Sequence, residues 1–143
     1  MRTLVDLIRV EGDENEKREE ALICRAGFKY VFETGKKEEI KIERSLPRMS
    51  ITFQINKKLY LCGGFDKVEK VEQCVADFFT IDYDGKSADL APMKNKRCHV
   101  SLSGLPSQML SLGGWNQENL KVCEKYLMER NKWIELPPLN TAR

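Results

Sequence analysis

The sequence lacks most of the features that identify an enzyme, a nucleic-acid-binding protein or a membrane protein. It has one histidine, His99, among 143 residues, and its five cysteines are scattered without a CxxC pair. The 24 basic and 22 acidic side chains leave a net charge of only +2. This charge is too small for a nucleic-acid footprint, and no apolar run approaches the ~20 residues of a membrane span. We therefore expect neither nucleic acid nor a membrane as a partner.

The scarcity of ligand-bearing and nucleophilic residues also argues against a cofactor. A metal site needs several converging ligands, which one histidine and dispersed cysteines do not supply. Cys98 and His99 are neighbours in a predicted strand, so their side chains point to opposite faces and cannot form a catalytic dyad. We interpret His99 as a packed or channel-lining residue, and the cysteines as reduced thiols of a cytoplasmic protein without a signal peptide. We expect no catalytic residues, no metal site and no cofactor.

The sequence does contain a tandem repeat built around glycine pairs. The apolar runs LYLCGGFD (59–66) and LSLGGWN (110–116) contain the doublets Gly63-Gly64 and Gly113-Gly114. Without a Cβ atom, glycine adopts positive φ, lets the chain leave a sheet sharply and permits a close approach by another backbone. Each doublet is therefore predicted to mark the end of a strand.

Alternating apolar and polar runs before each doublet predict a β-hairpin. Its turn is Asn56-Lys57-Lys58 in the first unit and Gly104-Leu105-Pro106-Ser107 in the second. After each doublet come two further β-rich runs and a proline-containing loop. The unit is therefore predicted to form four antiparallel strands.

The two units align beyond their doublets. The alignment places Pro92 on Pro138 and Arg97 on Arg143. It also places Gly85 on Asn131, two residue types that tolerate the left-handed turn conformation. We therefore assign one unit to residues 50–97 and the other to residues 98–143.

The N-terminal third of the chain matches this pattern less fully. Residues 26–49 resemble the second half of a preceding unit, because Gly35 precedes Gly85 by one repeat length and Leu46-Pro47-Arg48 resembles the ending of a unit. Residues 1–25 are either helical, by the propensity of residues 13–25, or a degraded outer strand and loop.

The order of these residues resembles the kelch repeat. The carriers in the second unit are Gly113, Gly114, Tyr126, Trp133, Leu136, Pro138 and Arg143, and those in the first are Gly63, Gly64, Leu90, Pro92, Met93 and Arg97. The first unit departs from the pattern, since Thr80 stands where Tyr126 stands and Ser87 where Trp133 stands. The resemblance implies an all-β fold of antiparallel four-stranded blades in a partial β-propeller. Tyr126 and Trp133 would fill the wedge between blades.

The expected propeller is an incomplete ring. Closed propellers have about 4–8 blades, and this chain has two clear units with about half of a third. Three explanations remain open. The chain is a fragment of a longer protein, it closes a ring by self-association, or it is an open β-meander that is stable alone.

The resemblance also indicates where a partner would bind. The loop between the second and third strands of a blade emerges on the same face as the loops between blades. Seven residues of this face are the candidate partner-binding residues: Phe65, Asp66, Lys67, Arg97, Trp115, Asn116 and Gln117. Trp115, flanked by amides and by Arg97, has the composition of an interface hot spot; packing over the edge of the neighbouring blade is the alternative.

The expected function is that of a non-enzymatic protein–protein interaction module, acting as a scaffold or substrate adaptor. The resemblance implies that the loop face binds a peptide segment of another protein, such as a ubiquitin-ligase or cytoskeletal component. The alternative is a fragment of a propeller enzyme, of isomerase, oxidase or specifier type, whose site needs the missing blades.

Overall fold

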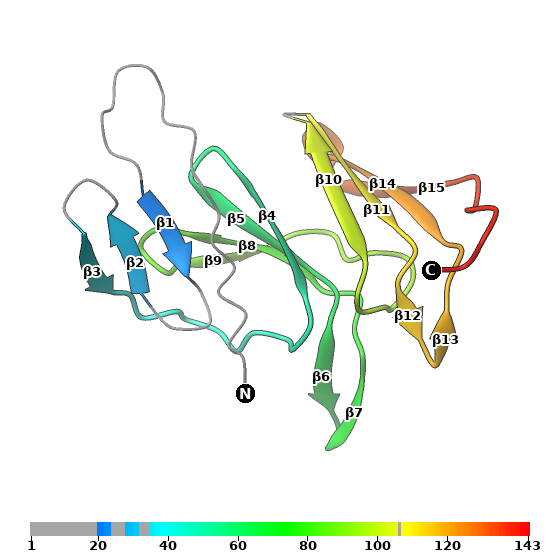
Figure 1. Cartoon of the computed structure of the whole chain (residues 1–143), viewed down its shortest axis with the longest axis horizontal. Helices are drawn as coiled ribbons and strands as arrows, with labels where there is room; N and C mark the ends of the chain where they lie inside the picture. The colour runs from blue at the N-terminus through cyan, green and yellow to red at the C-terminus, as the bar shows by residue number, and fades with distance from the viewer. Residues whose placement is uncertain (1–19, 24–27, 32–34, 106) are drawn as a thin grey trace.

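The computed structural model describes residues 20–23, 28–31, 35–105 and 107–143. Every strand pairing among these residues is antiparallel. The sheets lie next to one another in the order of the chain and do not close into a ring (Figure 1). The predicted all-β class with antiparallel four-stranded sheets is therefore confirmed. None of the described residues belongs to a helix long and apolar enough to cross a membrane.

The strands form three sheets and two short hairpins. The first sheet contains β1 (Glu20–Ile23), β2 (Phe28–Val31) and β3 (Lys36–Glu39). The second, here called the central blade, contains β4 (Ile51–Ile55), β5 (Lys58–Cys62), β8 (Phe78–Asp82) and β9 (Ser87–Asp89). The third, the C-terminal blade, contains β10 (Ser101–Leu105), β11 (Gln108–Leu112), β14 (Cys123–Leu127) and β15 (Lys132–Leu136). The hairpins are β6 (Phe65–Val68) with β7 (Val71–Cys74), and β12 (Trp115–Asn116) with β13 (Glu118–Asn119).

The N-terminal predictions fall partly outside the described residues. Of the predicted segment 1–25, only β1 is described, and it is a strand. The remaining residues of that segment, on which the helical alternative depends, lie outside the described part. In the predicted half-unit 26–49, β2 pairs with both β1 and β3, so the described sheet has three strands.

The two hairpin turns differ from their predictions. The first turn consists of Asn56 and Lys57 alone, with φ values of 50° and 57°, and Lys58 already begins β5. Two left-handed central residues give the turn a twist that matches that of the flanking strands. In the second hairpin, Gly104 and Leu105 belong to β10 and not to the turn; Pro106 lies outside the described residues.

Gly104, which was predicted to lie in a turn, instead has a role in packing between the two blades. A Cβ atom at this position would lie 2.6 Å from Cε1 of Phe53, a residue of the central blade. A glycine at this point therefore lets β10 approach β4. The prediction of a turn was wrong because the reason for the glycine lies in the neighbouring blade.

The Gly-Gly doublets end their strands as predicted. β5 ends at Cys62 and β11 at Leu112, and all four glycines of the doublets have positive φ. A Cβ atom on Gly63 would lie 2.2 Å from the carbonyl oxygen of Arg97, and one on Gly113 equally close to that of Arg143. Each doublet is thus both a bend and a site where the end of the same unit packs against it.

The strand register corrects one position of the alignment between units. Tyr126 pairs with Met109, three residues before the end of β11, whereas Ile81 pairs with Leu59, three residues before the end of β5. Ile81, and not Thr80, therefore stands where Tyr126 stands. The error arose because Tyr126 and its partner Trp133 are seven positions apart, whereas Ile81 and its partner Ser87 are six positions apart. Ser87 does stand where Trp133 stands, since they pair with Ile81 and Tyr126 respectively.

Tyr126 and Trp133 lie between the two blades, where the resemblance places them. Their rings contact Phe78 of the central blade, with centroid distances of 4.7 and 5.0 Å, and each other at 5.3 Å. The Nε1 of Trp133 donates a hydrogen bond to the carbonyl oxygen of Ala91, and the hydroxyl of Tyr126 bonds Oδ1 of Asn131. The aromatic edges and the satisfied polar groups together fix how the blades pack.

The opposite face of the central blade packs toward the N-terminal sheet. Leu59, Leu61, Phe79 and Ile81 are buried there against residues of the segment that follows β3. The guanidinium of Arg44 lies 3.7 Å from the centroid of the Phe79 ring. The central blade is thus covered on both faces.

Candidate functional site

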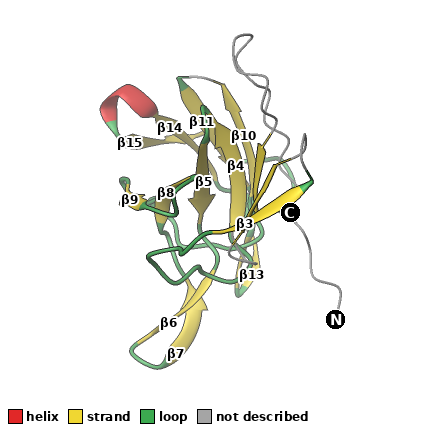
Figure 2. Cartoon of the chain, turned by 90° about the vertical axis from the view of Figure 1, so that its left-hand side faces the viewer, coloured by secondary structure: helices red, strands yellow, loops and turns green. Residues whose placement is uncertain are grey.

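Both hairpins project from the same side of the molecule, here called the loop face. The β6–β7 and β12–β13 hairpins extend below the two blades in Figure 1, and the β6–β7 hairpin projects farthest in Figure 2. Each hairpin begins directly after a doublet. The bend at the two glycines therefore directs the hairpin away from the blade. The repeat therefore builds a surface from equivalent loops of two neighbouring blades.

Phe65 and Trp115 are the first residues after the two doublets, and the structure brings them together. Their ring centroids lie 5.7 Å apart at an interplanar angle of 48°. The backbone nitrogen of Phe65 donates to the carbonyl oxygen of Arg48, and that of Trp115 donates to the carbonyl oxygen of Cys98. Because these bonds hold both backbones, the aromatic pair is fixed by the architecture of the repeat. Both residues were predicted as site residues.

A groove of about 400 Å³ opens beside this aromatic pair. Its lining consists of Met49, Phe65, His99, Gly114, Trp115, Asn119 and Arg143. Three of these side chains are large and apolar, and the polar ones are an imidazole, an amide and a guanidinium. A groove of this size and mixture suits side chains of a protein segment, with an apolar group against the rings and hydrogen-bond acceptors near Arg143.

The backbone holds Met49 and His99 in equivalent, unusual conformations. Their φ values are 56° and 52°, and each follows a residue that bridges to the aromatic of its own blade. His99 precedes β10 and is exposed, so the prediction of a strand at this residue and the packed alternative were wrong, whereas the channel-lining alternative stays a prediction. These conformations could not be predicted from the sequence, because neither residue is a glycine or an asparagine.

The other predicted hairpin residues lie on the loop face without lining the groove. Asp66 is half-buried, and its Oδ1 accepts a hydrogen bond from the backbone nitrogen of Lys67, which is exposed. Asn116 is half-buried in β12, and the exposed Gln117 forms the turn of the short hairpin with φ of 66°. These four residues lie on the same two hairpins as Phe65 and Trp115.

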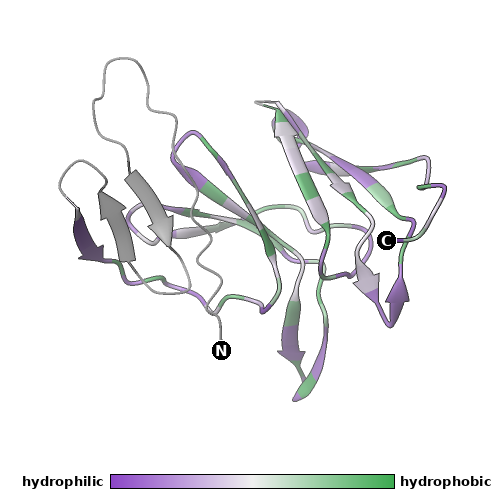
Figure 3. Cartoon of the chain, viewed as in Figure 1, coloured by the Kyte–Doolittle hydropathy of each residue, from purple (hydrophilic) through white to green (hydrophobic). Residues whose placement is uncertain are grey.

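Val68 and Val71 were not predicted, and they form an apolar tip on the longer hairpin. They pair directly across β6 and β7, and 40% and 62% of their surfaces are exposed. The tip is coloured hydrophobic in Figure 3, unlike most of the exposed strands around it. An exposed apolar pair at the end of a projecting hairpin is a common element of interaction surfaces.

Arg97 does not belong to this surface, contrary to the prediction. It is fully buried, and its Nη2 lies 2.5 Å from Oε2 of Glu124 in the C-terminal blade. Its Nη1 donates to the carbonyl oxygens of Gly113 and Val122, at 2.7 and 3.0 Å. Arg97 therefore connects the end of the central blade to the next blade. Its side chain was misplaced because all three acceptors belong to a different unit.

Glu124 completes this buried connection and was missed in the sequence. Its Oε1 accepts hydrogen bonds from the backbone nitrogen of Lys94 and from Nδ2 of Asn95. A buried carboxylate is stable only when it is paired and hydrogen-bonded. One signal for Glu124 was available in the sequence. It is an acidic residue in the predicted strand Val-Cys-Glu-Lys-Tyr, in the unit that follows Arg97.

The described residues offer little for metal or nucleophilic chemistry. No group of three or more His, Cys, Asp or Glu side chains in the described ranges could hold a metal ion. Cys62 is buried between the blades, and this burial raises the pKa of its thiol to about 12, although nearby Arg97 opposes the shift. The thiol therefore stays protonated at neutral pH, and the thiolate is the nucleophilic form of cysteine.

Comparisons with known proteins identify the repeat. Residues 96–140 match the family model described as the Kelch motif. No curated protein matches the chain. The matched range runs from the end of the inter-blade linker through β15, so it covers the doublet Gly113-Gly114 and the two wedge aromatics. This motif, the two four-stranded sheets of the same plan and the matched glycine doublets together support a kelch-repeat assignment.

Proposed function

We propose that the chain is a non-enzymatic protein–protein interaction module that binds a peptide segment of another protein at its loop face. Kelch repeats generally mediate protein–protein interactions, which supports the general class. The observation that carries the proposal is the pair formed by Phe65 and Trp115, whose rings lie 5.7 Å apart beside a groove of about 400 Å³. A scaffold or substrate-adaptor role follows, with the blades holding the loops in place.

The rigidity of the groove supports binding by preformed contacts. The carbonyl oxygen of Trp115 accepts a hydrogen bond from the backbone nitrogen of Cys98, and the thiol of Cys74 approaches the same oxygen at 3.3 Å. The aromatic platform is thus anchored from two directions before any partner arrives. Binding to such a surface requires little ordering of side chains, which lowers its entropic cost.

The experiment compares protein partners of the tagged chain and of three variants. Trp115→Ala and Phe65→Ala remove the platform, whereas Glu129→Ala changes an exposed residue of the 3-10 turn at the opposite end of the C-terminal blade. We expect the same specific partners with the unmodified chain and with Glu129→Ala. Trp115→Ala should weaken the affinity for them by about 30-fold, the effect of a hot spot of ~2 kcal/mol.

Folding must be checked in the same samples. Circular dichroism and unfolding temperature should be close to those of the unmodified chain for Trp115→Ala, since this side chain is half-exposed. If folded Trp115→Ala and Phe65→Ala variants retained every partner with unchanged affinity, the loop face would not be the binding surface.

A further inference from the structure

Cys74 and Cys98 are two buried cysteines that have no part in the binding surface proposed above. Cys74 ends β7, the second strand of the longer hairpin, and Cys98 begins the C-terminal unit. Both side chains are buried, although they belong to neighbouring repeats. Nothing in the sequence pairs them, because they lie far apart and form no CxxC motif.

The backbone brings the two cysteines side by side. The nitrogen of Arg97 donates a hydrogen bond to the carbonyl oxygen of Val75 at 3.1 Å. This bond joins the residue before Cys98 to the residue after Cys74. Gly64 bonds both segments, since its carbonyl oxygen accepts from the nitrogen of Val75 and its nitrogen donates to the carbonyl oxygen of Arg97. The positions of the two cysteines are therefore fixed at the first glycine doublet.

The two thiols also share one acceptor. The sulfur of Cys74 lies 3.3 Å from the carbonyl oxygen of Trp115, and the sulfur of Cys98 lies 3.6 Å from the same atom. Burial raises the pKa of the Cys98 thiol to about 12, and a hydrogen bond with the thiol of Cys74 adds to this shift. The two thiols are therefore hydrogen-bonded neighbours in the reduced protein.

The chemistry of the pair suits a disulfide better than a metal ion. In the described part of the chain, no group of three or more His, Cys, Asp or Glu side chains could hold a metal. The pair thus lacks the further ligands that a structural zinc site needs. A disulfide needs only two sulfur atoms and carries no charge, so burial does not oppose it.

We propose that Cys74 and Cys98 form a reversible disulfide that fastens the β6–β7 hairpin to the start of the C-terminal unit. The oxidant is a small-molecule disulfide. The thiolate of Cys74 attacks one sulfur of this oxidant, forms a mixed disulfide and releases the other half as a thiolate. Cys98 loses its proton and attacks the sulfur of Cys74, and the second half leaves. The protein thiols thus lose two electrons and two protons, which the oxidant takes up as two small thiols.

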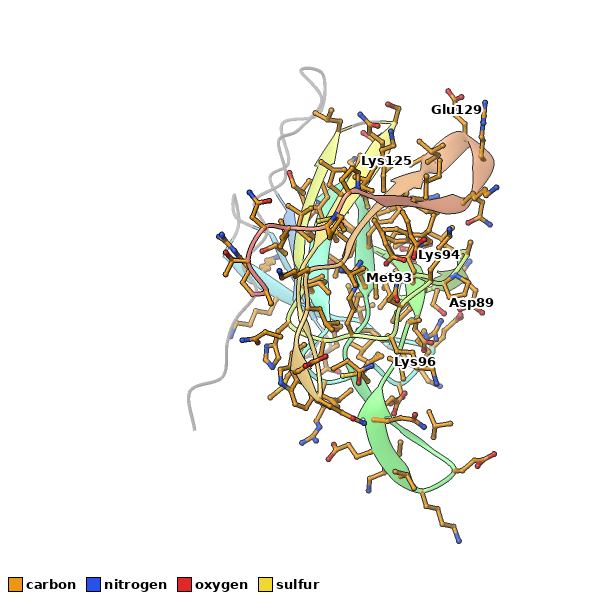
Figure 4. The ribbon with its side chains drawn as sticks, turned by 90° about the vertical axis from the view of Figure 1, so that its right-hand side faces the viewer. Asp89, Met93, Lys94, Lys96, Lys125 and Glu129 are labelled. Carbon is orange, nitrogen blue, oxygen red and sulfur yellow. The ribbon has the colours of Figure 1, made fainter. Side chains whose placement is uncertain are left out.

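Local opening of the hairpin gives the oxidant access to Cys74. In Figure 4, the β6–β7 hairpin projects downward, away from the blades and from the labelled Lys96, which precedes Cys98 by two residues. A hairpin of two strands is only marginally stable by itself, and such elements open more readily than the core of a domain. Cys74 is the last residue of this hairpin, so its opening uncovers the thiol.

The disulfide would join two segments that line the groove. Phe65 pairs with Cys74 across the hairpin, and His99 directly follows Cys98. In the unfolded chain, the bond would close a loop of about 25 residues, which stabilises the folded state. Oxidation should therefore raise the unfolding temperature and slow hydrogen exchange at the base of the hairpin. This inference does not depend on what the loop face binds.

The test oxidises the full chain in buffers with increasing ratios of oxidised to reduced glutathione, blocks free thiols with iodoacetamide and maps the tryptic peptides. Cys74 falls in peptide 71–86 and Cys98 in peptide 98–121, and each of the other three cysteines falls in a peptide of its own. We expect peptides 71–86 and 98–121 as one linked product that a reductant separates. The unfolding temperature should rise by about 10 °C on oxidation.

Serine variants separate this bond from a general effect of oxidation. Cys74→Ser and Cys98→Ser should each lose both the linked product and the rise in unfolding temperature. Cys123→Ser should keep both, because the thiol of Cys123 approaches the carbonyl oxygen of Lys121, at 3.6 Å. Each variant is compared with its own reduced form, so differences in stability between variants do not enter. The peptide map of the unmodified chain needs no variant and decides the question if a serine variant does not fold.

Three results would overturn the proposal. One is a folded chain whose thiols at positions 74 and 98 both stay free in excess oxidised glutathione. Another is a stable glutathione adduct at Cys74 without a link to Cys98, which would show that the two thiols do not meet. The third is a linked product that unfolds at a lower temperature than the reduced chain, because the bond would then strain the fold.

Discussion

Replacing Arg97 by Met should destabilise the protein more than any surface substitution, because it leaves a buried carboxylate without its cation. Arg97→Met removes the ion pair with Glu124 and the two hydrogen bonds to the carbonyl oxygens of Gly113 and Val122. Breaking a buried pair in this way costs about 3–5 kcal/mol. At roughly 2–4 °C per kcal/mol for a domain of this size, the unfolding temperature should fall by about 10 °C.

Removing both partners should cost less than the sum of the single changes. In Arg97→Met combined with Glu124→Leu, no charge remains buried, and an apolar pair is often neutral in such places. An apolar pair already occupies the equivalent positions at the preceding junction between sheets. Pro47 is equivalent to Arg97, because the residue after it, Arg48, bridges to Phe65 in the way that Cys98 bridges to Trp115. Pro47 is buried, and Phe79 stands where Glu124 stands. Lys94 and Asn95 still lose their acceptor, so we expect recovery of about half of the loss and not all of it.

Urea unfolding followed by tryptophan fluorescence provides the assay, since Trp133 is buried between the blades. Glu129→Ala on the exposed 3-10 turn serves as the control and should change the free energy of unfolding by less than ~0.5 kcal/mol. The reasoning would be refuted by a loss below about 1 kcal/mol for Arg97→Met. Strict additivity in the double variant would refute it as well, because residues in contact are expected to couple.

Three further predictions concern the glycines and the buried thiol. Gly114→Val should lower the unfolding temperature more than Trp115→Ala, because φ at Gly114 is 104° and a Cβ atom would lie 2.7 Å from the carbonyl oxygen of Cys98; equal unfolding temperatures would contradict the strand–doublet–hairpin assignment. Gly104→Ala should cost about 1–3 kcal/mol through its contact with Phe53, and Phe53→Leu in the same chain should recover part of this loss in urea unfolding. Burial raises the pKa of the Cys62 thiol from 9.0 to about 12, so its contribution to stability is complete below pH 9 and is lost as the pH rises toward 12. Urea midpoints measured between pH 8 and 11 should fall less steeply for Cys62→Ala, and an identical fall in both proteins would show that this thiol does not titrate as described.

The strands and doublets could be predicted because their chemistry is local. Alternation of apolar residues and a glycine pair after each apolar run depend on the backbone of one unit alone, and the structure places both as expected. The left-handed turn residues Gly85 and Asn131 were predicted for the same reason, with φ values of 84° and 44°. Local sequence is sufficient where the cause of a conformation lies within a few residues.

The inter-blade contacts could not be predicted in the same way. Arg97 was assigned to the surface because the loop between the blades was expected to emerge on the loop face, but the acceptors of its side chain come from the next blade. Gly104 was assigned to a turn, whereas its small size accommodates Phe53 from the preceding blade. One extra residue before β15 shifted the match of Tyr126 from Ile81 to Thr80. For Arg97 and Gly104, the atoms that decide the conformation belong to a neighbouring repeat.

The aromatic residues of the candidate site were predicted from the sequence, whereas two other residues that line its groove were not. Phe65 and Trp115 follow the doublets and could be found from the repeat. Met49 and His99 line the same groove through left-handed conformations that their residue types do not signal. The sequence therefore located the loop face but not the shape of its groove.

The most direct test of the loop face as a binding surface is site-specific photo-crosslinking. A photo-reactive phenylalanine analogue would replace Trp115 in the groove or, as the matched control, Glu129 at the other end of the C-terminal blade. The account predicts that irradiation in cells joins the chain to a discrete set of proteins from position 115 and not from position 129. Equal adducts from both positions, or adducts from position 129 alone, would contradict it.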